Sequence, residues 1–158
     1  MHRLLSLLML LLPGGLVAGQ LEVGSRLPAL GFEDQFGQAH RLDEQARLIL
    51  FLPDRRAGRI ARKALRGQDQ AALTARGIVG IGDISGMPML VTYVLALPKL
   101  REQPWLVLLG NTAEDTALFP RRAEAVTLIR VQAGEITGLE YFTDKNSLRA
   151  TLGFPPED

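Results

Sequence analysis

The sequence predicts an α/β fold with a mixed central sheet. Three short, almost wholly apolar runs, at residues 48–52, 78–81 and 105–109, are typical of strands buried on both faces of a sheet. Helical patterning separates these runs, so right-handed crossovers should bring the strands together in parallel. Residues 30–42 and 126–142 have the pattern of two hairpins, which should add antiparallel strands. We expect helices on both faces of this sheet.

The helical stretches have recognisable beginnings and ends. From Arg55 to about Arg76, apolar residues recur on one side of a single predicted helix. A second helix is predicted over residues 87–97, with Ser85 as its N-cap. The prolines that bound residues 98–104 indicate a connector after that helix. A final helix is predicted over residues 144–152.

The first nineteen residues have the three-part layout of a secretory signal peptide. A basic start precedes an apolar run over residues 4–12, which Pro-Gly-Gly interrupts, and small residues at 17–19 suit cleavage before Gln20. The apolar run is well short of the ~20 residues that span a bilayer, which disfavours a membrane anchor. We therefore predict a signal peptide over residues 1–19 and one domain over residues 20–158, with no stable membrane insertion after cleavage.

The composition excludes several kinds of chemistry. The 158 residues contain no cysteine, which rules out disulfides, thiolate catalysis, Cys-ligated zinc and iron–sulfur clusters. The net charge of +1 gives no global field that would favour nucleic acid. No dinucleotide fingerprint, Walker pattern or serine nucleophile elbow is present, so we predict no cofactor. With His40 as the one histidine after the signal peptide, a Ser-His-Asp site has little support.

Several segments resemble those of the thioredoxin-like superfamily. Residues 24–28 (GSRLP), before the first hairpin, are similar to the leading segment of the peroxiredoxin and thiol-reductase branch. The strand at 48–52 with its following helix resembles the strand before the redox motif, and residues 127–136 resemble the late hairpin. Ala-Gly-Arg at 57–59 is similar to the pattern of the exported YtfJ-like group. The resemblance implies a thioredoxin-like three-layer sandwich with a mixed central sheet and an N-terminal hairpin, in a periplasmic protein.

The sequence departs from that superfamily at its catalytic positions. Where thiol reductases carry two cysteines at the start of the first long helix, this sequence has Arg56 and Arg59. The position of the usual cis-proline falls at about Ala125. The resemblance therefore implies a protein without thiol redox activity, in a non-catalytic binding or accessory role.

A dense group of cations marks the first predicted helix. These residues are Arg55, Arg56, Arg59, Arg62, Lys63 and Arg66. At ~100° per residue they occupy about a third of the helix circumference, opposite the apolar side. Cations in the first turn add to the partial positive charge of the helix N-terminus, so this end could hold an anion or an acidic partner. An ordinary solvated surface helix is the alternative.

Polar residues beside this helix complete the candidate site. Asp54 either caps the helix or directs the guanidinium of Arg59. Asp83 and Ser85 follow a buried strand, at the carboxyl edge of the sheet where ligands bind in open α/β folds, and helix capping is their alternative role. The candidate set for binding an anion or a partner is Asp54, Arg55, Arg56, Arg59, Asp83 and Ser85.

Three functions remain open at this level. The first is a binding protein for an unknown periplasmic protein or a small anion. The second is a non-thiol enzyme that uses an arginine-lined anion pocket together with Asp83. The third is copper handling through Met87, Met89 and His40. Core packing is the favoured role of both methionines, and His40 is interpreted as an ordinary strand residue.

Overall fold

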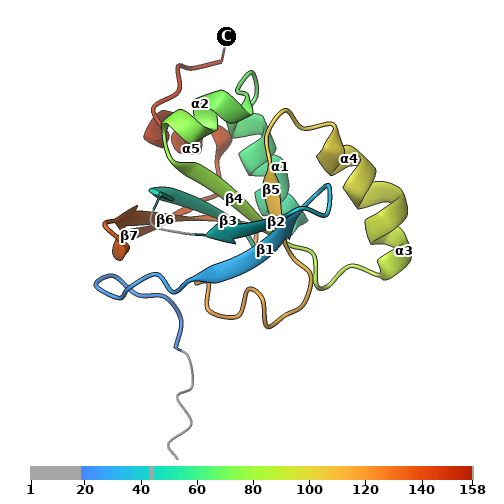
Figure 1. Cartoon of the computed structure of the whole chain (residues 1–158). Coiled ribbons are helices and arrows are strands. Elements are labelled where there is room, and N and C mark those ends of the chain that lie inside the picture. Colours follow the sequence, from blue (N-terminus) through green and yellow to red (C-terminus); the bar gives the residue numbers. More distant parts are fainter. Residues whose placement is uncertain (1–18, 43–44, 158) are drawn as a thin grey trace, which may run out of the picture.

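The computed structural model describes residues 19–42 and 45–157, so the predicted signal peptide lies, apart from Gly19, outside the described residues. Seven strands form one mixed sheet in the order β2-β1-β5-β4-β3-β6-β7 (Figure 1). The strands are β1 (Leu30–Asp34), β2 (Ala39–Leu42), β3 (Leu48–Leu52), β4 (Ile78–Asp83), β5 (Val107–Gly110), β6 (Val126–Gln132) and β7 (Glu135–Phe142). The predicted α/β class, its mixed sheet and its N-terminal hairpin are confirmed.

The centre of the sheet is parallel and its margins are antiparallel. β4 pairs in parallel with β3 and with β5, as the strand–helix–strand pattern predicted. β3 pairs antiparallel with β6, and β1 pairs antiparallel with β2 and β5. Ile49, Leu50 and Phe51 of β3 are buried on both faces, which explains why this strand is a continuous apolar run.

The first predicted helix is two helices. The helices are α1 (Arg55–Ala64), α2 (Gln70–Ala75), α3 (Met89–Val91), the π-helical η1 (Thr92–Ala96), α4 (Leu97–Arg101) and α5 (Lys145–Thr151). Between α1 and α2, Gly67 has a φ of 77°, a left-handed conformation that interrupts a helix. The Asp69 carboxylate then accepts the backbone N–H of Ala72 at 2.8 Å and begins a new helix. The prediction of one helix from Arg55 to Arg76 is therefore wrong.

The second predicted helix begins later and ends later than expected. α3, η1 and α4 form one helical run from Met89 to Arg101, and Pro98 lies inside it rather than in a connector. In a regular α-helix the Pro98 ring would clash with the carbonyl of Val94. The wider π-helical turn ends directly before that position, where Leu97 donates its N–H to the carbonyl of Thr92.

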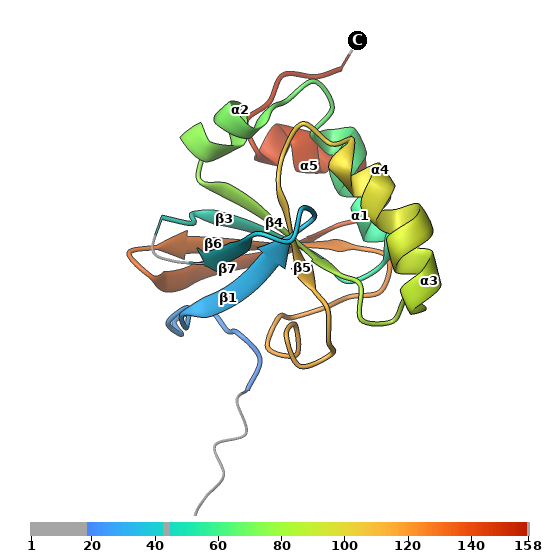
Figure 2. The same cartoon turned by 45° about the vertical axis from the view of Figure 1, so that its right-hand side comes forward.

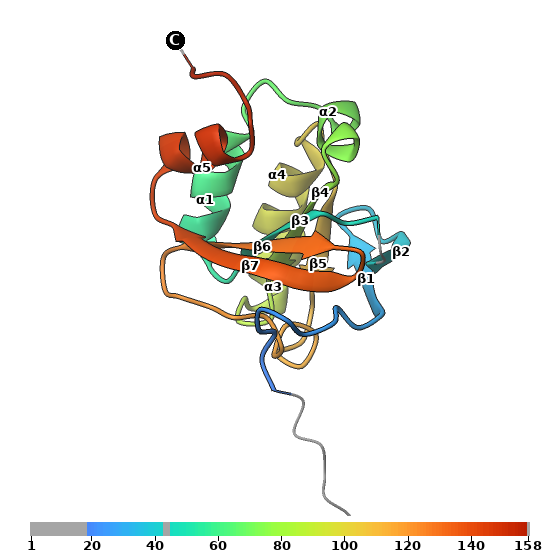
Figure 3. The same cartoon turned by 90° about the vertical axis from the view of Figure 1, so that its left-hand side faces the viewer.

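The two faces of the sheet are covered differently. One apolar cluster includes Ile60, Leu73, Leu97 and Leu148, from α1, α2, α4 and α5. The opposite cluster is built around Phe119 and contains no helical residue among those described. Its outer layer is the N-terminal segment and the loop over residues 111–125, drawn in orange on the far side of the sheet from α1 (Figures 2 and 3). The expectation of helices on both faces is wrong here, because irregular segments form the third layer.

A buried carboxylate fixes the first hairpin. The Asp34 side chain is 1 % exposed, and its Oδ1 accepts the N–H groups of Phe36 at 2.8 Å and Gln38 at 3.0 Å. Its Oδ2 lies 2.7 Å from Nε2 of His40. Burial raises the pKa of Asp34, but these hydrogen bonds and the nearby histidine more than offset it, so the pKa lies below its usual value. His40 is therefore a strand residue that also supports the turn.

Replacing His40 with alanine should lower the free energy of unfolding by about 1 kcal/mol, because the buried Asp34 loses one hydrogen bond and keeps two. Urea denaturation at neutral pH measures the change. Arg41→Ala is the matched control, since Arg41 is the next residue of the same strand and is exposed. Equal losses in the two variants would contradict the role given to His40.

Candidate functional site

The start of α1 is held by Asp54. Its Oδ1 accepts the backbone N–H groups of Arg56 and Ala57, both at 2.9 Å, so the predicted N-cap is confirmed. Its Oδ2 accepts the N–H of Glu124 at 2.7 Å, which ties α1 to the loop before β6. The ion pairs within residues 19–42 and 45–157 do not include Asp54 with Arg59, so the directing role is not observed.

The cations of α1 form an exposed and largely uncompensated surface. Arg56 lies 3.7 Å from the carboxylate of Glu124, and Arg66, just beyond the helix, lies 3.5 Å from Glu157. The other four have no ion-pair partner in the described part of the chain, and they are Arg55, Arg59, Arg62 and Lys63. The surplus positive charge makes this surface attractive to anions.

A cleft of about 480 Å³ lies between α1 and the helical run α3–η1–α4. One wall carries cations of α1, namely Arg55, Arg59 and Arg62, and Lys99 of α4 lines the cleft as well. Its apolar lining comes from the sheet, the segment before β5 and the run α3–η1–α4, and includes Leu52, Leu95, Trp105, Val107 and Leu109. A cleft with an apolar lining and a few charged groups fits a ligand that has both an apolar part and an anionic part.

The structure brings four of the six candidate residues to this cleft. They are Asp54, Arg55, Arg59 and Asp83. Arg56 does not line it, because its guanidinium lies beside Glu124. Ser85 lines a different hollow of about 420 Å³, between the turn of the first hairpin and α3–η1–α4. The expectation of one site made by all six residues therefore reduces to four of them.

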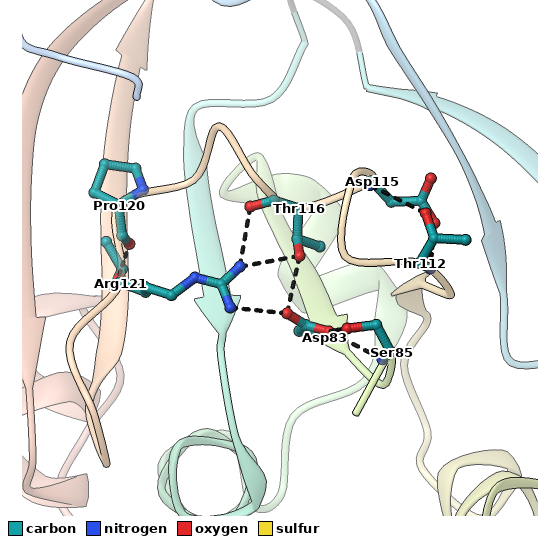
Figure 4. Close-up of polar contacts among 8 residues, drawn as sticks. Asp83, Ser85, Thr112, Asp115, Thr116, Pro120 and Arg121 are labelled. Carbon is teal, nitrogen blue, oxygen red and sulfur yellow. Dashed lines mark hydrogen bonds and ion pairs between the residues drawn. The ribbon is translucent and has the colours of Figure 1, made fainter. Parts of the chain in front are cut away.

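Asp83 is the centre of a polar network at the end of β4 (Figure 4). Its Oδ1 accepts the N–H of Ser85 at 3.0 Å and the Ser85 hydroxyl at 2.6 Å. Its Oδ2 accepts the hydroxyl of Thr116 at 2.9 Å and Nη1 of Arg121 at 3.0 Å. Neither Asp83 nor Ser85 caps the following helix, whose preceding residue is Pro88. The capping interpretation is wrong, and the network instead joins β4 to the loop over residues 111–125.

The network keeps Asp83 ionised and gives each of its two carboxylate oxygens two hydrogen bonds. Burial raises its pKa, but hydrogen bonds from Ser85, Thr116 and Arg121 more than offset this, so the pKa of Asp83 lies below its usual value. A carboxylate with a low pKa and four donors already bound is a poor general base.

Sequence reasoning missed two members of this network. Thr116 and Arg121 lie more than 30 residues from Asp83 along the chain, and no local pattern links them to it. Arg121 also donates to the carbonyl and the hydroxyl of Thr116, each at 3.1 Å. Its guanidinium lies 5.3 Å from the centroid of the Phe51 ring, so Arg121 bridges the sheet and the loop.

No protein-family model matches this chain, and neither does any curated protein. Solved structures do match it. A candidate protein disulfide isomerase from Bacteroides thetaiotaomicron has 14 % identity and a TM-score of 0.58, covering 84 % of this chain and 87 % of that chain. Peroxidoxin BcpB from Mycobacterium tuberculosis has 14 % identity and a TM-score of 0.57, covering 85 % and 96 %.

A third similar structure is the pneumococcal exposed lipoprotein thioredoxin Etrx1 from Streptococcus pneumoniae. It has 14 % identity and a TM-score of 0.52, covering 80 % of this chain and 98 % of that chain. At such identities the likeness shows the fold alone. The chain therefore has a thioredoxin-like α/β fold, built from a sequence without a single cysteine.

Proposed function

We propose that this protein is a non-catalytic binding protein, which holds an acidic segment of a partner protein in the cleft between α1 and α3–η1–α4. The observation that carries the proposal is the combination in one cleft of an apolar lining with Arg55, Arg59 and Arg62, which have no ion-pair partner in the described residues. Thiol exchange is unavailable, because the sequence has no cysteine.

Binding is favoured over enzymatic chemistry by the state of the two carboxylates in the cleft. Asp54 accepts three backbone N–H groups, and Asp83 accepts four hydrogen bonds. These hydrogen bonds occupy both carboxylates, and no histidine among the described residues lines the cleft. A non-thiol enzyme is therefore the weaker candidate.

The lining of the cleft favours a protein segment over a small anion. A small inorganic anion would contact the arginines and leave the apolar surface of Leu52, Val107 and Leu109 unused. A peptide that carries both carboxylates and apolar side chains would cover both kinds of surface, and buried apolar contact is the larger source of binding free energy.

The same proposal places the protein in the periplasm. It is supported by the signal-peptide pattern over residues 1–19 and by the similarity of residues 57–59 to the YtfJ-like group. One structural neighbour is described as an exposed lipoprotein, so this fold occurs outside the cytoplasm in other proteins. An accessory role beside a periplasmic partner follows from this proposal.

A labelled synthetic peptide that alternates glutamate and leucine is the probe, and fluorescence anisotropy measures its affinity. The double variant Arg59→Glu, Arg62→Glu should weaken binding at least about tenfold, because two attractive contacts become repulsive. Replacing every glutamate of the peptide with lysine should abolish binding to the wild type.

The control is Lys63→Glu, Arg66→Glu, which changes the net charge equally at exposed residues that do not line the cleft. This variant should keep most of the affinity. Equal losses in the two variants would show attraction by overall charge alone and would contradict the cleft. Full competition by inorganic phosphate would favour a small anion instead.

A further inference from the structure

The helical run α3–η1–α4 presents large apolar side chains to solvent. We call five of them the apolar ridge: Met89, Leu90, Tyr93, Val94 and Leu95, which are 76 %, 74 %, 65 %, 59 % and 54 % exposed. Elsewhere in the described residues, the exposed large apolar side chains are Val23, at 60 %, and Phe36, at 51 %. Such a concentration on one short helix marks a surface that something apolar covers.

The ridge offers almost nothing polar to a partner. Residues 84–98 contain no charged side chain. Thr92 is buried and its hydroxyl donates to the carbonyl of Pro88, so the Tyr93 hydroxyl is the one polar side-chain group of the ridge. Protein interfaces carry about one hydrogen bond per 100–200 Å², which this surface cannot supply.

The shape of the ridge also favours contact with lipid, which can deform around it, over contact with a rigid protein partner. Hollows lie on both flanks of the helix, one toward α1 and one toward the first hairpin. Leu90 and Val94 line neither hollow, so they project from the crest between them. A rigid partner would need a matching groove, whereas lipid closes around a projecting helix, and tyrosine is a typical residue of the membrane–water interface.

Cations stand beside this apolar surface. Lys99 and Arg101 lie at the end of the same helix, and Arg59 and Arg62 line the cleft next to it. None of these four has an ion-pair partner within the described residues. Apolar side chains flanked by unpaired cations match a surface of anionic lipid headgroups.

The length of the helical run determines whether it could span a bilayer or would lie on its surface. The run has 13 residues, or about 20 Å, against a hydrocarbon core of about 30 Å. No helix in the described part of the chain is long and apolar enough to cross a bilayer. We propose that the apolar ridge docks the protein reversibly on an anionic membrane surface, with α3–η1–α4 lying in the interface.

The test is co-sedimentation with phosphatidylcholine vesicles that contain about 30 mol % phosphatidylglycerol. The protein used is residues 20–158, which include every described helix and strand and omit the apolar run at 4–12 that could bind lipid by itself. Leu90→Glu should lower the partition coefficient about tenfold or more while the melting temperature stays unchanged, because Leu90 is 74 % exposed. Raising the salt concentration to about 0.5 M should weaken binding of the wild type.

Val23→Glu is the matched control, since Val23 is 60 % exposed and lies far from the ridge in sequence, and it should bind vesicles like the wild type. No binding by the wild type, or equal binding by Leu90→Glu, would overturn the proposal. Dimers in analytical ultracentrifugation that Leu90→Glu dissociates, without vesicle binding, would also overturn it in favour of a second copy. Leu90→Glu should keep its affinity for the acidic peptide, so the cleft and the ridge can fail separately.

Discussion

Replacing Arg149 with leucine is expected to lower the free energy of unfolding by about 3–5 kcal/mol. Arg149 of α5 is 6 % exposed. Its Nη1 donates to the carbonyls of Ala64 at 2.8 Å and Arg66 at 2.9 Å, and its Nε donates to the carbonyl of Pro155. The first two carbonyls belong to the end of α1 and its following turn, where a helix leaves acceptors without partners. Leucine would leave three acceptors without this donor.

Equilibrium denaturation in urea at 25 °C measures this effect. Arg62→Leu is the control, because Arg62 is an exposed cation of α1 without an ion pair in the described residues, and its loss should change stability by less than about 0.5 kcal/mol. Arg149→Lys should fall between the two, since it keeps the charge but loses the fork of donors. A leucine variant as stable as the wild type would mean that this network does not hold α5 to α1.

Replacing Asp83 with asparagine is expected to lower the free energy of unfolding by about 2–3 kcal/mol at pH 7. The Asp83 side chain is 6 % exposed and accepts four hydrogen bonds. Asparagine keeps one acceptor oxygen, but its amide would turn a donor toward the donors of Thr116 and Arg121. The loop over residues 111–125, which places Phe119 in the apolar cluster on this face of the sheet, would lose its tie to β4.

The pH dependence of this difference follows from the lowered pKa of Asp83. A carboxyl whose folded pKa is depressed contributes its stability fully above its unfolded pKa, near the reference value of 3.8, and loses it as pH falls through the folded pKa. The wild type and Asp83→Asn should therefore differ most at neutral pH and converge below about pH 3. Denaturation curves at pH 7 and at low pH test this, and a constant difference would contradict the ionised network.

The sheet could be predicted from the sequence because its signals are local. β3 matches its predicted bounds, since a five-residue apolar run ended by Pro53 has few alternatives. The helices were harder to predict, because residues that interrupt a helix occur within stretches that otherwise favour helix. Gly67 and Asp69 are turn and cap signals within an otherwise helix-compatible stretch. At Pro98, a π-helical turn preserves a helix that the sequence pattern predicted to end before it.

In the candidate site too, the features that are local in sequence could be predicted and those that depend on tertiary structure could not. The cations of α1 and the Asp54 cap are close in sequence, so the spacing alone predicted their shared position. The network of Asp83 with Thr116 and Arg121 depends on tertiary structure, and no local pattern indicates it. Exposure was also beyond local reasoning, because an apolar helix can face a core or solvent. Met87 packs against the core as predicted, whereas the prediction for Met89 is wrong, since it is 76 % exposed.

Helices cover one face of the sheet and irregular segments cover the other, so we expect local unfolding to begin on the irregular side. Between β5 and β6, the backbone of the loop over residues 111–125 makes isolated hydrogen bonds, such as Phe119 N–H to Thr116 O at 3.1 Å, instead of a repeating ladder. A few side-chain hydrogen bonds, to Asp83 and Asp54, tie the loop to the rest of the molecule. Its partial detachment would separate the Phe119 ring from the Phe51 ring and expose both while β3, β4 and the helices stay intact. Amides in this loop should exchange with solvent through such a sub-global opening, and those of β3 through complete unfolding.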